Sequence, residues 1–541
     1  MKLKTLLLLL SLWLLASTFI GLNSWGVQET SEARYAEISR EMISSGDWLH
    51  PRLLEIGHYH KPPVTYWLTA ISMKIAGVSA GGARFLMQIC FLLQVLLVYH
   101  IAKIYWGNEK TAFLAAGLFV LMPLQLMAVR NVTTDLYLAG FELAAIFFFM
   151  KYYLVKQYKW LYAALLAMGI AFLTKGPVGL LFPILSVIPF KRKWGANPHP
   201  KVWHTCTALL LGVLISISWY LVMVIENPMF LRYFLFRHTL ERFAGASVFS
   251  RSEPFWYFLV FVPATLLMPF FALVHYLVKI GKRLFKDEHA YFIFWLIVVP
   301  IIFFSISSSK RILYVLPLAP LTAILAAGII ATYTEKLQIN FLRIMLAIWG
   351  LFPLAFIIAP VFIPQLHATF YLIGLSVLML AVVIAAILRL TKEPIVVTGA
   401  MSFILCGLLM VSSTVILEQR DSIPGSSRSL AKWIEQNTEN ETVIVYDKLL
   451  PSLAFELQRP IVSLHNRSKN LLRETDFEPD DRYKDYLVEY ADSSAVSSLL
   501  TQPSILLVWK DIDEQAQWMR SFYTTDKRIG KWTIIYREDG A

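Results

Sequence analysis

Long hydrophobic runs constrain this chain more than any other feature. Apolar runs of about 18 to 25 residues recur from Thr5 to Leu417, and each is long enough to cross a hydrocarbon core of roughly 30 Å. Backbone polar groups inside lipid must be satisfied within their own segment, so we expect these runs to be helices. With 57% hydrophobic and 16% charged residues over 541 positions, the composition excludes an ordinary soluble protein.

The runs predict an α-helical polytopic membrane protein with about thirteen transmembrane helices. The expected spans are residues 5–25, 83–105, 110–128, 134–154, 158–174, 177–190, 203–225, 255–279, 289–307, 312–332, 341–363, 369–389 and 396–417. We expect the first to be a span, not a cleaved signal peptide, because apolar character continues to Trp25 without a clear small-residue cleavage site.

Positive charge divides the connections between spans into two classes. The connections at 151–159, 191–195, 279–286 and 389–392 are rich in Lys and Arg, which predicts that they are cytoplasmic. Alternate connections and the C-terminus then fall on the outer face. The net charge is +12, and its basic residues are scattered at span ends instead of forming one stripe. Nucleic acid is therefore not an expected partner.

Composition also divides the chain into two domains. Residues 1–417 form the predicted membrane domain, which includes a long outer loop at 26–82, and residues 418–541 form a polar domain. In the polar part, strand-like runs alternate with helix-like stretches near 427–437 and 482–500, which favours a small α/β domain. The strand-like runs are 442–447, 460–464, 504–510 and 532–537. Cys90, Cys206 and Cys406 form no CxxC pair and no disulfide framework.

The loop at 26–82 contains an unusually polar stretch beside a membrane. Tyr35, Ile38 and Met42 share one helical face, while Glu37, Arg40 and Glu41 take the other. This pattern predicts an amphipathic helix that lies in the membrane interface. The apolar run at 63–77 is short for a span, and we expect it to lie flat as well.

Six charged clusters are predicted on the outer face. They are Glu32/Arg34/Tyr35, "HYHKPP" (58–63), "RNVTTD" (130–135), "TKGP" (174–177), "RHTLERF" (237–243) and "SKR" (309–311). Charged groups that face a bundle interior are costly and usually functional. Carboxylates beside Lys and Arg suit chemistry on a lipid-linked phosphate, because cations neutralise the leaving phosphate and a carboxylate takes a proton from the acceptor.

The motifs "SEARYAEISREMISSGDW", "HKPP", "TDLYL", "LTKGPVGLL" and "FRHTLERF…PFWYF" resemble the bacterial lipid A aminoarabinose transferases. More widely, they resemble the protein O-mannosyltransferase-like branch of the GT-C glycosyltransferases. The similarity covers roughly residues 5–330 by motif. It implies a bacterial inner-membrane enzyme with a periplasmic active site and a periplasmic C-terminal domain. This enzyme is expected to be an inverting transferase that takes a sugar from a polyprenyl phosphate, usually undecaprenyl phosphate, to lipid A or another glycan or lipid.

The resemblance leaves two candidates for the catalytic base. Members of the family commonly begin the first motif with Asp-Glu, whereas this chain has Ser31 and Glu32. Because serine is no base, Glu32 or Asp135 is expected to deprotonate the acceptor. The structural alternative for Glu32 is a first-turn acid that complements the helix dipole, and for Asp135 it is an ion pair with Arg130.

The resemblance also implies contacts with the donor. Lys61 matches the lysine that contacts the donor phosphate, although the preceding residue is His60 where the family usually has glutamate. The sequence identifies no definite cofactor, and a divalent metal held by His60 and His238 is an open alternative. The other residues that match binding positions of the family are Arg34, Tyr35, Arg84, Lys175, Arg242, Lys310, Arg311 and Tyr314. Some of these are expected to bind sugar or phosphate and others to pack or snorkel.

Two other functions remain open from the sequence. A protein O-glycosyltransferase keeps the same chemistry with a protein acceptor. A transporter or flippase for the lipid-linked sugar is the rival from another class, but such proteins often have paired repeats and helices broken at the midplane, and the sequence has neither pattern. The C-terminal domain either binds the acceptor or caps the cavity. Glu142, deep in the 134–154 run, is expected to be a hydrogen-bonded structural acid.

Overall fold

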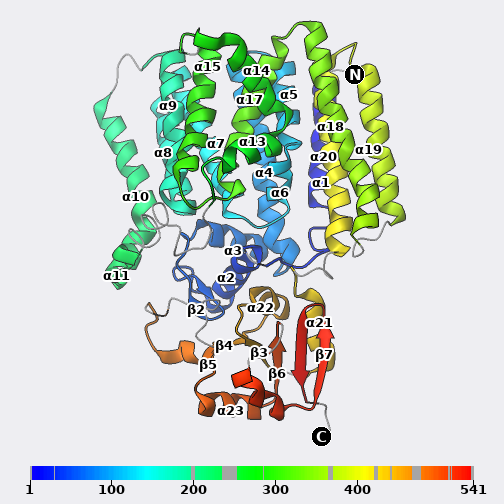
Figure 1. Cartoon of the computed structure of the whole chain (residues 1–541). Helices are drawn as coiled ribbons and strands as arrows, with labels where there is room; N and C mark the ends of the chain where they lie inside the picture. The colour runs from blue at the N-terminus through cyan, green and yellow to red at the C-terminus, as the bar shows by residue number, and fades with distance from the viewer. Residues whose placement is uncertain are drawn as a thin grey trace.

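The protein is a helical bundle with a mixed layer at one end. The computed structural model describes residues 3–29, 31–196, 201–233, 253–283, 285–363, 369–419, 425–438, 441–465, 475, 477–509, 512 and 514–537. Figure 1 shows the bundle above, a small layer from the 26–82 loop below it, and a C-terminal sheet domain at the bottom. The layer therefore lies between the bundle and the C-terminal domain.

Each predicted hydrophobic run is helical. The bundle contains α1 (Leu3–Phe19), α4 (Ala80–Trp106), α5 (Glu109–Val120), α6 (Pro123–Val129), α7 (Thr134–Val155), α8 (Tyr158–Lys175), α9 (Leu181–Trp194), α10 (Val202–Glu226), α13 (Tyr257–Leu266), α14 (Met268–Ile280), α15 (Glu288–Ile293), α16 (Val299–Ile306), α17 (Leu318–Ala331), α18 (Glu335–Phe362), α19 (Phe370–Arg389) and α20 (Pro394–Gln419). Between α15 and α16 lies a π-helical turn, η5 (Phe294–Val298).

Among the described residues, the number of helices long enough to span a membrane is smaller than the thirteen expected. Within the described residues, eight helices are long and apolar enough to cross a membrane, or up to ten if each bent pair is one span. The helices α1 and α17 are apolar but shorter. Nearly every residue of α17 is buried in the bundle, so this helix packs against protein rather than lipid.

The 37-residue stretch Tyr158–Trp194, which counts as one span by length, reverses direction. Lys156 Nζ, just before α8, donates hydrogen bonds to the carbonyl oxygens of Trp194 (2.9 Å) and Gly195 (2.6 Å), just after α9. Both ends of the stretch therefore lie on the same side. The chain turns at the 3₁₀ helix η1 (Gly176–Leu180), which places Lys175 at the end of the bundle opposite to Lys156.

A proline lies at the bend of each of the two bent helix pairs. The axes of α5 and α6 differ by 63°, and Pro123 begins α6. The axes of α13 and α14 differ by 115°, with Leu267 at a φ of +53° and Pro269 in the first turn of α14. Proline lacks an N–H and clashes with the preceding turn, so it starts a new helix instead of continuing the old one.

The layer below the bundle comprises α2 (Ser31–Ser45), the hairpin β1 (Arg52–Leu53) and β2 (Ile56–Gly57), and α3 (Val64–Ala76). The helix predicted from the polar stretch is present, and α3 is not among the candidate spans. However, the predicted interfacial position of α2 is wrong. Ile38 and Met42 pack with residues of the C-terminal domain such as Leu453, and the charged face is buried too.

The buried charges of α2 are held by each other. Arg40 donates to both oxygens of Glu37, from Nε at 2.8 Å and from Nη2 at 2.7 Å. Glu41 accepts from the backbone N–H of Glu55 at 3.3 Å. Burial, then the negative charges of Glu37 and Glu55, raise the pKa of Glu41 well above its usual range. One ion pair and one carboxyl of raised pKa thus replace the solvated face expected from the sequence.

The C-terminal domain is α/β, as predicted. Its elements are α21 (Arg428–Asn437), β3 (Thr442–Tyr446), α22 (Pro451–Leu457), β4 (Val462–His465), η9 (Asp481–Asp485), β5 (Leu487–Glu489), α23 (Ser493–Thr501), β6 (Ser504–Val508), η10 (Glu514–Phe522), β7 (Thr525–Ile529) and β8 (Trp532–Tyr536). The sheet order is β5-β4-β3-β6-β8-β7, parallel from β5 to β6 and antiparallel beyond. The helix expected over 482–500 is instead η9, β5 and α23.

Hydrogen bonds join this domain to the first loop. The backbone N–H of Ser452 donates to Glu29 Oε1 at 2.8 Å, and the backbone N–H of Glu29 donates to the carbonyl oxygen of Gly425 at 2.6 Å. Burial raises the pKa of Glu29 to about 7 from its ordinary 4.5, against smaller opposing effects of Ser452 and Arg34. The junction is therefore a place where a proton can be bound near neutral pH.

We expect the stability of the junction to fall as pH rises. A carboxyl whose pKa is higher in the folded state contributes stability that is fully present below about 4.5 and is lost as pH rises through about 7. In Glu29→Gln the amide oxygen still accepts from Ser452, but nothing titrates. Thermal unfolding between pH 5 and pH 8 checks this: the melting temperature of the wild type should fall relative to that of the variant. Parallel curves would contradict it.

Candidate active site

Three predicted residues meet at the end of the bundle that faces the C-terminal domain. Asp135 lies in the first turn of α7, and Lys175 is the last residue of α8. Lys175 Nζ donates a hydrogen bond to Asp135 Oδ1 and lies 4.2 Å from the ring centroid of Tyr314, which is in the 3₁₀ helix η6 (Ile312–Val315). Both charged side chains are largely buried, with 8% of Lys175 and 14% of Asp135 exposed.

Asp135 pairs through one of its two carboxylate oxygens. Within the described part of the chain, Lys175 is the only side chain with which its carboxylate pairs, and the contact uses Oδ1. The pair with Arg130 that the sequence left as an alternative is wrong. Arg130 instead donates to the carbonyl oxygens of Thr18 and Met410 and to the hydroxyl of Ser413, which ties it to α1 and α20.

A threonine pair brings the Lys61 segment to the same place. Thr65 Oγ1 donates to Thr134 Oγ1 at 3.3 Å, and both residues are buried. Thr65 lies in the first turn of α3, four residues after Lys61, and Thr134 directly precedes Asp135. The N-termini of α3 and α7 therefore lie together, and the segment that carries the half-buried Lys61 leads into this junction.

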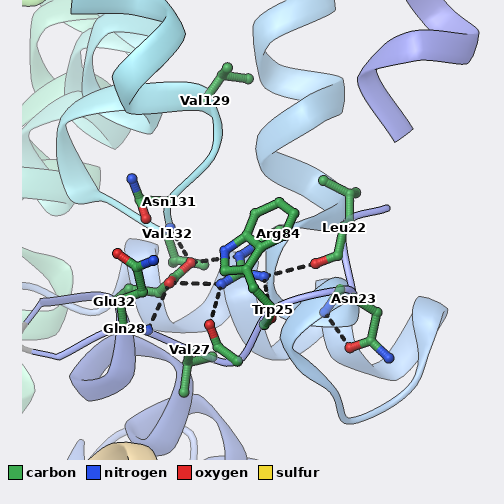
Figure 2. A network of polar contacts seen from close by, with 12 residues as sticks. Leu22, Asn23, Trp25, Val27, Gln28, Glu32, Arg84, Val129, Asn131 and Val132 are labelled. Carbon is green, nitrogen blue, oxygen red and sulfur yellow. Dashed lines mark hydrogen bonds and ion pairs between the residues drawn. The ribbon is translucent and has the colours of Figure 1, made fainter. Parts of the chain in front are cut away.

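Glu32 is engaged differently. Its carboxylate accepts four hydrogen bonds: from Arg84 Nε at 2.7 Å and Nη2 at 2.8 Å, and from the backbone N–H groups of Gln28 at 3.0 Å and Val132 at 3.1 Å. Figure 2 shows Glu32 and Arg84 facing each other across this network. Only 3% of the Glu32 side chain is exposed, so it has no free face for an acceptor.

The side chain of Arg84 is also fully engaged in hydrogen bonds. It also donates from Nη1 to the carbonyl oxygens of Leu22 (2.8 Å) and Trp25 (3.0 Å), and from Nη2 to that of Gly26 (2.9 Å). Its guanidinium carbon lies 4.2 Å from the Trp25 ring centroid. All five N–H donors are thus used, and the geometry favours a structural role for the Glu32–Arg84 pair over the predicted base and substrate contact.

This pair still bears on the site. The Glu32–Val132 hydrogen bond holds the loop that leads into α7 only three residues before Asp135. The pair also fixes the start of α2 to the start of α4. It therefore sets where the first motif and Asp135 lie relative to each other, which explains why so polar a stretch lies beside the bundle.

The remaining predicted residues are spread around this centre. Lys310, 5% exposed, donates to the carbonyl oxygens of Glu253 (2.8 Å) and Ser307 (2.5 Å), so it joins two connecting segments. The Tyr35 ring centroid lies 5.9 Å from that of Tyr66. Arg34 and Arg311 are half-buried. Arg242 and His238 lie outside the described residues.

The described residues give no support to the alternative of a metal site. Among the described residues, no group of three or more His, Cys, Asp or Glu side chains is arranged to hold a metal ion. The ring centroid of His60 lies 4.0 Å from that of His58. Because His238 is outside the described residues, the predicted pair of histidines is not tested.

Glu142 differs from its expectation. It is fully buried in α7, and within the described residues neither carboxylate oxygen has a hydrogen-bond partner. It lies two turns after Asp135, and both Asp135 and Lys175 are near enough to act on its charge. The hydrogen-bonded structural acid expected from the sequence is therefore not what the structure has.

The fold and this arrangement define the class of protein. A polytopic helical bundle, a layer of two short helices and a hairpin below it, and charged side chains gathered between them form a GT-C membrane fold with an added α/β domain. ArnT from Cupriavidus metallidurans, solved with bound undecaprenyl phosphate, has this fold: the TM-score is 0.77 at 22% identity, over 99% of this chain and 98% of that one. Its apo form gives a TM-score of 0.75.

The resemblance expected from the motifs is confirmed. The family model for dolichyl-phosphate-mannose-protein mannosyltransferase matches residues 60–236. The chain is 32% identical over 344 residues to undecaprenyl phosphate-alpha-4-amino-4-deoxy-L-arabinose arabinosyl transferase 2 of Proteus mirabilis, covering 62% of this chain and 61% of that protein. The enzyme of Pectobacterium atrosepticum is 31% identical over 57% of this chain and 56% of its own length. The match thus spans about three fifths of the length of these relatives.

Proposed function

We propose that this protein transfers a sugar from a polyprenyl phosphate donor, with undecaprenyl phosphate as the carrier, to a lipid or glycan acceptor such as lipid A. The observation that carries the proposal is the convergence of Asp135, Lys175 and Tyr314 beside the Lys61 segment. The relatives of similar sequence are named for the same donor chemistry.

In the proposed reaction an acceptor hydroxyl attacks the anomeric carbon of the donor. The bond from that carbon to the phosphate oxygen breaks, and the phosphate leaves with the electron pair. The acceptor proton goes to Oδ2 of Asp135, while Lys175 holds Oδ1 and fixes the orientation of the carboxylate. Lys61 neutralises the charge that develops on the phosphate.

Charge and burial support these roles. A carboxylate and two lysines in a largely buried site interact more strongly than they would in water. The Tyr314 ring beside Lys175 offers an apolar face for a sugar. We further propose that the site and the C-terminal domain are periplasmic, because the Lys- and Arg-rich connections, such as 191–193, lie at the opposite end of the bundle.

Lys61→Ala tests the role of the donor lysine. Loss of a charge-assisted contact to phosphate is expected to raise KM for the lipid donor roughly 10- to 100-fold. Transfer from a labelled donor by the purified protein in detergent measures this, with Lys159→Ala, in a predicted cytoplasmic connection, as the matched control. Equal KM values for the two variants would contradict the assignment.

The same assay separates an enzyme from a transporter. Detergent removes the transmembrane gradient, so consumption of donor with formation of product is expected only from a transferase. Protein acceptors and lipid acceptors offered in parallel distinguish lipid glycosylation from protein O-glycosylation. No product with any acceptor would overturn the proposed function.

A further inference from the structure

The C-terminal domain reaches the segment that carries Lys61. Glu478 accepts a hydrogen bond from the backbone N–H of Gly57 at 2.5 Å and pairs with Arg52 Nη2 at 2.7 Å. Gly57 and Arg52 face each other across the β1–β2 hairpin. Only 3% of the Glu478 side chain is exposed, so a single buried carboxylate from the C-terminal domain holds both strands of the hairpin.

The approach leaves little room for a side chain at position 57. A Cβ atom on Gly57 would lie 3.1 Å from Glu478 Oε1 and 2.9 Å from the Tyr59 ring. Hydrogen bonds extend the hairpin by one residue, because the N–H of His58 donates to the carbonyl oxygen of Pro51 at 2.8 Å. The backbone is thus fixed up to three residues before Lys61.

Phe477, which directly precedes Glu478, packs against Tyr59, a residue between the hairpin and Lys61. The ring centroid of Phe477 lies 5.7 Å from that of Tyr59, 5.9 Å from that of Phe230 and 4.8 Å from that of Tyr233, each in an edge-on arrangement. Tyr59 is 7% exposed and precedes Lys61 by two residues. Aromatic pairs of this geometry add to the stability that burial gives.

Two prolines restrict the backbone between Lys61 and α3. Pro62 and Pro63 follow Lys61 and lead into α3, whose first turn is tied to α7 by the Thr65–Thr134 bond. Lys61 therefore lies on a short segment fixed at one end by α7 and at the other by Phe477 and Glu478. Proline restricts φ, so little freedom remains between the two ends.

We propose that Glu478 and Phe477 are positioning residues that set the place of Lys61, so that the C-terminal domain controls affinity for the donor phosphate. This inference rests on the proposed function. It assigns the domain a part in donor binding, where the sequence left only acceptor binding or a cap.

The chain offers a matched control. Glu456, also in the C-terminal domain, accepts from the backbone N–H of Val27 at 3.2 Å and from Arg428 Nε at 3.1 Å, and 12% of its side chain is exposed. It thus makes the same two kinds of contact, with a backbone N–H of the first loop and with an arginine that here belongs to its own domain, at a place remote in sequence from Lys61. Glu478→Gln and Glu456→Gln differ in location more than in chemistry.

The test measures KM and kcat for the lipid donor, with the full chain in detergent. E478Q is expected to raise KM roughly three- to tenfold with kcat nearly unchanged, because one charged hydrogen bond is weakened, whereas E456Q should leave KM as in the wild type. The double variant K61A/E478Q should match K61A, since Glu478 acts through Lys61.

Several results would overturn the inference. Equal KM for E478Q and E456Q, or effects of K61A and E478Q that multiply, would show that Glu478 does not position Lys61. If E478Q does not fold, F477L makes the same comparison with the same expectation. A wild type that turns over no donor would end the proposed function itself, whereas normal wild-type turnover with unchanged E478Q ends only the inference.

Discussion

Asp135→Asn is expected to abolish most sugar transfer while the protein still folds. A positioned carboxylate that takes a proton contributes about 10² to 10⁴ in rate, and the amide cannot take that proton. The amide oxygen can still accept the hydrogen bond from Lys175, so the geometry of α7 and α8 should survive. The loss is therefore expected in kcat, measured with labelled lipid donor at saturating concentration.

A matched control separates the chemistry from helix capping. Asp287 is the N-cap residue of α15, at the other end of the bundle, where its Oδ1 accepts from the backbone N–H of Ala290 at 2.8 Å. Asp287→Asn should transfer sugar at the wild-type rate. Glu32→Gln should retain turnover per folded molecule, because Glu32 is enclosed by protein donors. The reverse outcome, with Glu32→Gln inactive and Asp135→Asn active, would assign the base to Glu32.

Arg84→Met is expected to produce the largest loss of stability. Removing one partner of a buried ion pair leaves an uncompensated charge, which costs about 3–5 kcal/mol. Glu32 would lose two of its four donors, and the carbonyl oxygens of Leu22, Trp25 and Gly26 would lose theirs. Thermal unfolding in detergent should therefore show a much lower melting temperature, or folded protein should not be recovered.

An exposed ion pair provides the comparison. Lys103 Nζ donates to Glu109 Oε1 at 2.6 Å, and nearly half of each side chain is exposed. Solvent screens such a pair, so Lys103→Met should leave the melting temperature as it is. If Arg84→Met were as stable as Lys103→Met, the Glu32–Arg84 pair would not be the structural link that its hydrogen bonds indicate.

Local pattern was enough for much of the fold. Hydrophobic length predicted a helix for every run from α1 to α20, and the strand-like runs of the C-terminal domain became β3, β4, β6 and β8. These features depend on neighbours in sequence. The predicted number of spans differs from that in the structure, because α17 is short and apolar yet buried in protein, and hydropathy does not tell lipid from a protein interior.

Contacts between residues that are far apart in the chain could not be predicted from the sequence. The helical face of Glu37, Arg40 and Glu41 looked solvated because the pattern does not show that other parts of the chain bury both faces of α2, with the C-terminal domain on the side of Ile38. Likewise, Glu478 lies in an ordinary acidic stretch, and no local signal marks it as the partner of Gly57 and Arg52, which lie more than 400 residues away.

The sequence by itself determined that this chain is a membrane-embedded helical protein with a polar motif beside the bilayer, because apolar length and helical periodicity are properties of consecutive residues. Only the tertiary structure decided which acid pairs with Arg84 and which pairs with Lys175. Several acids and bases of similar character compete for each partner, and the packing of helices selects among them.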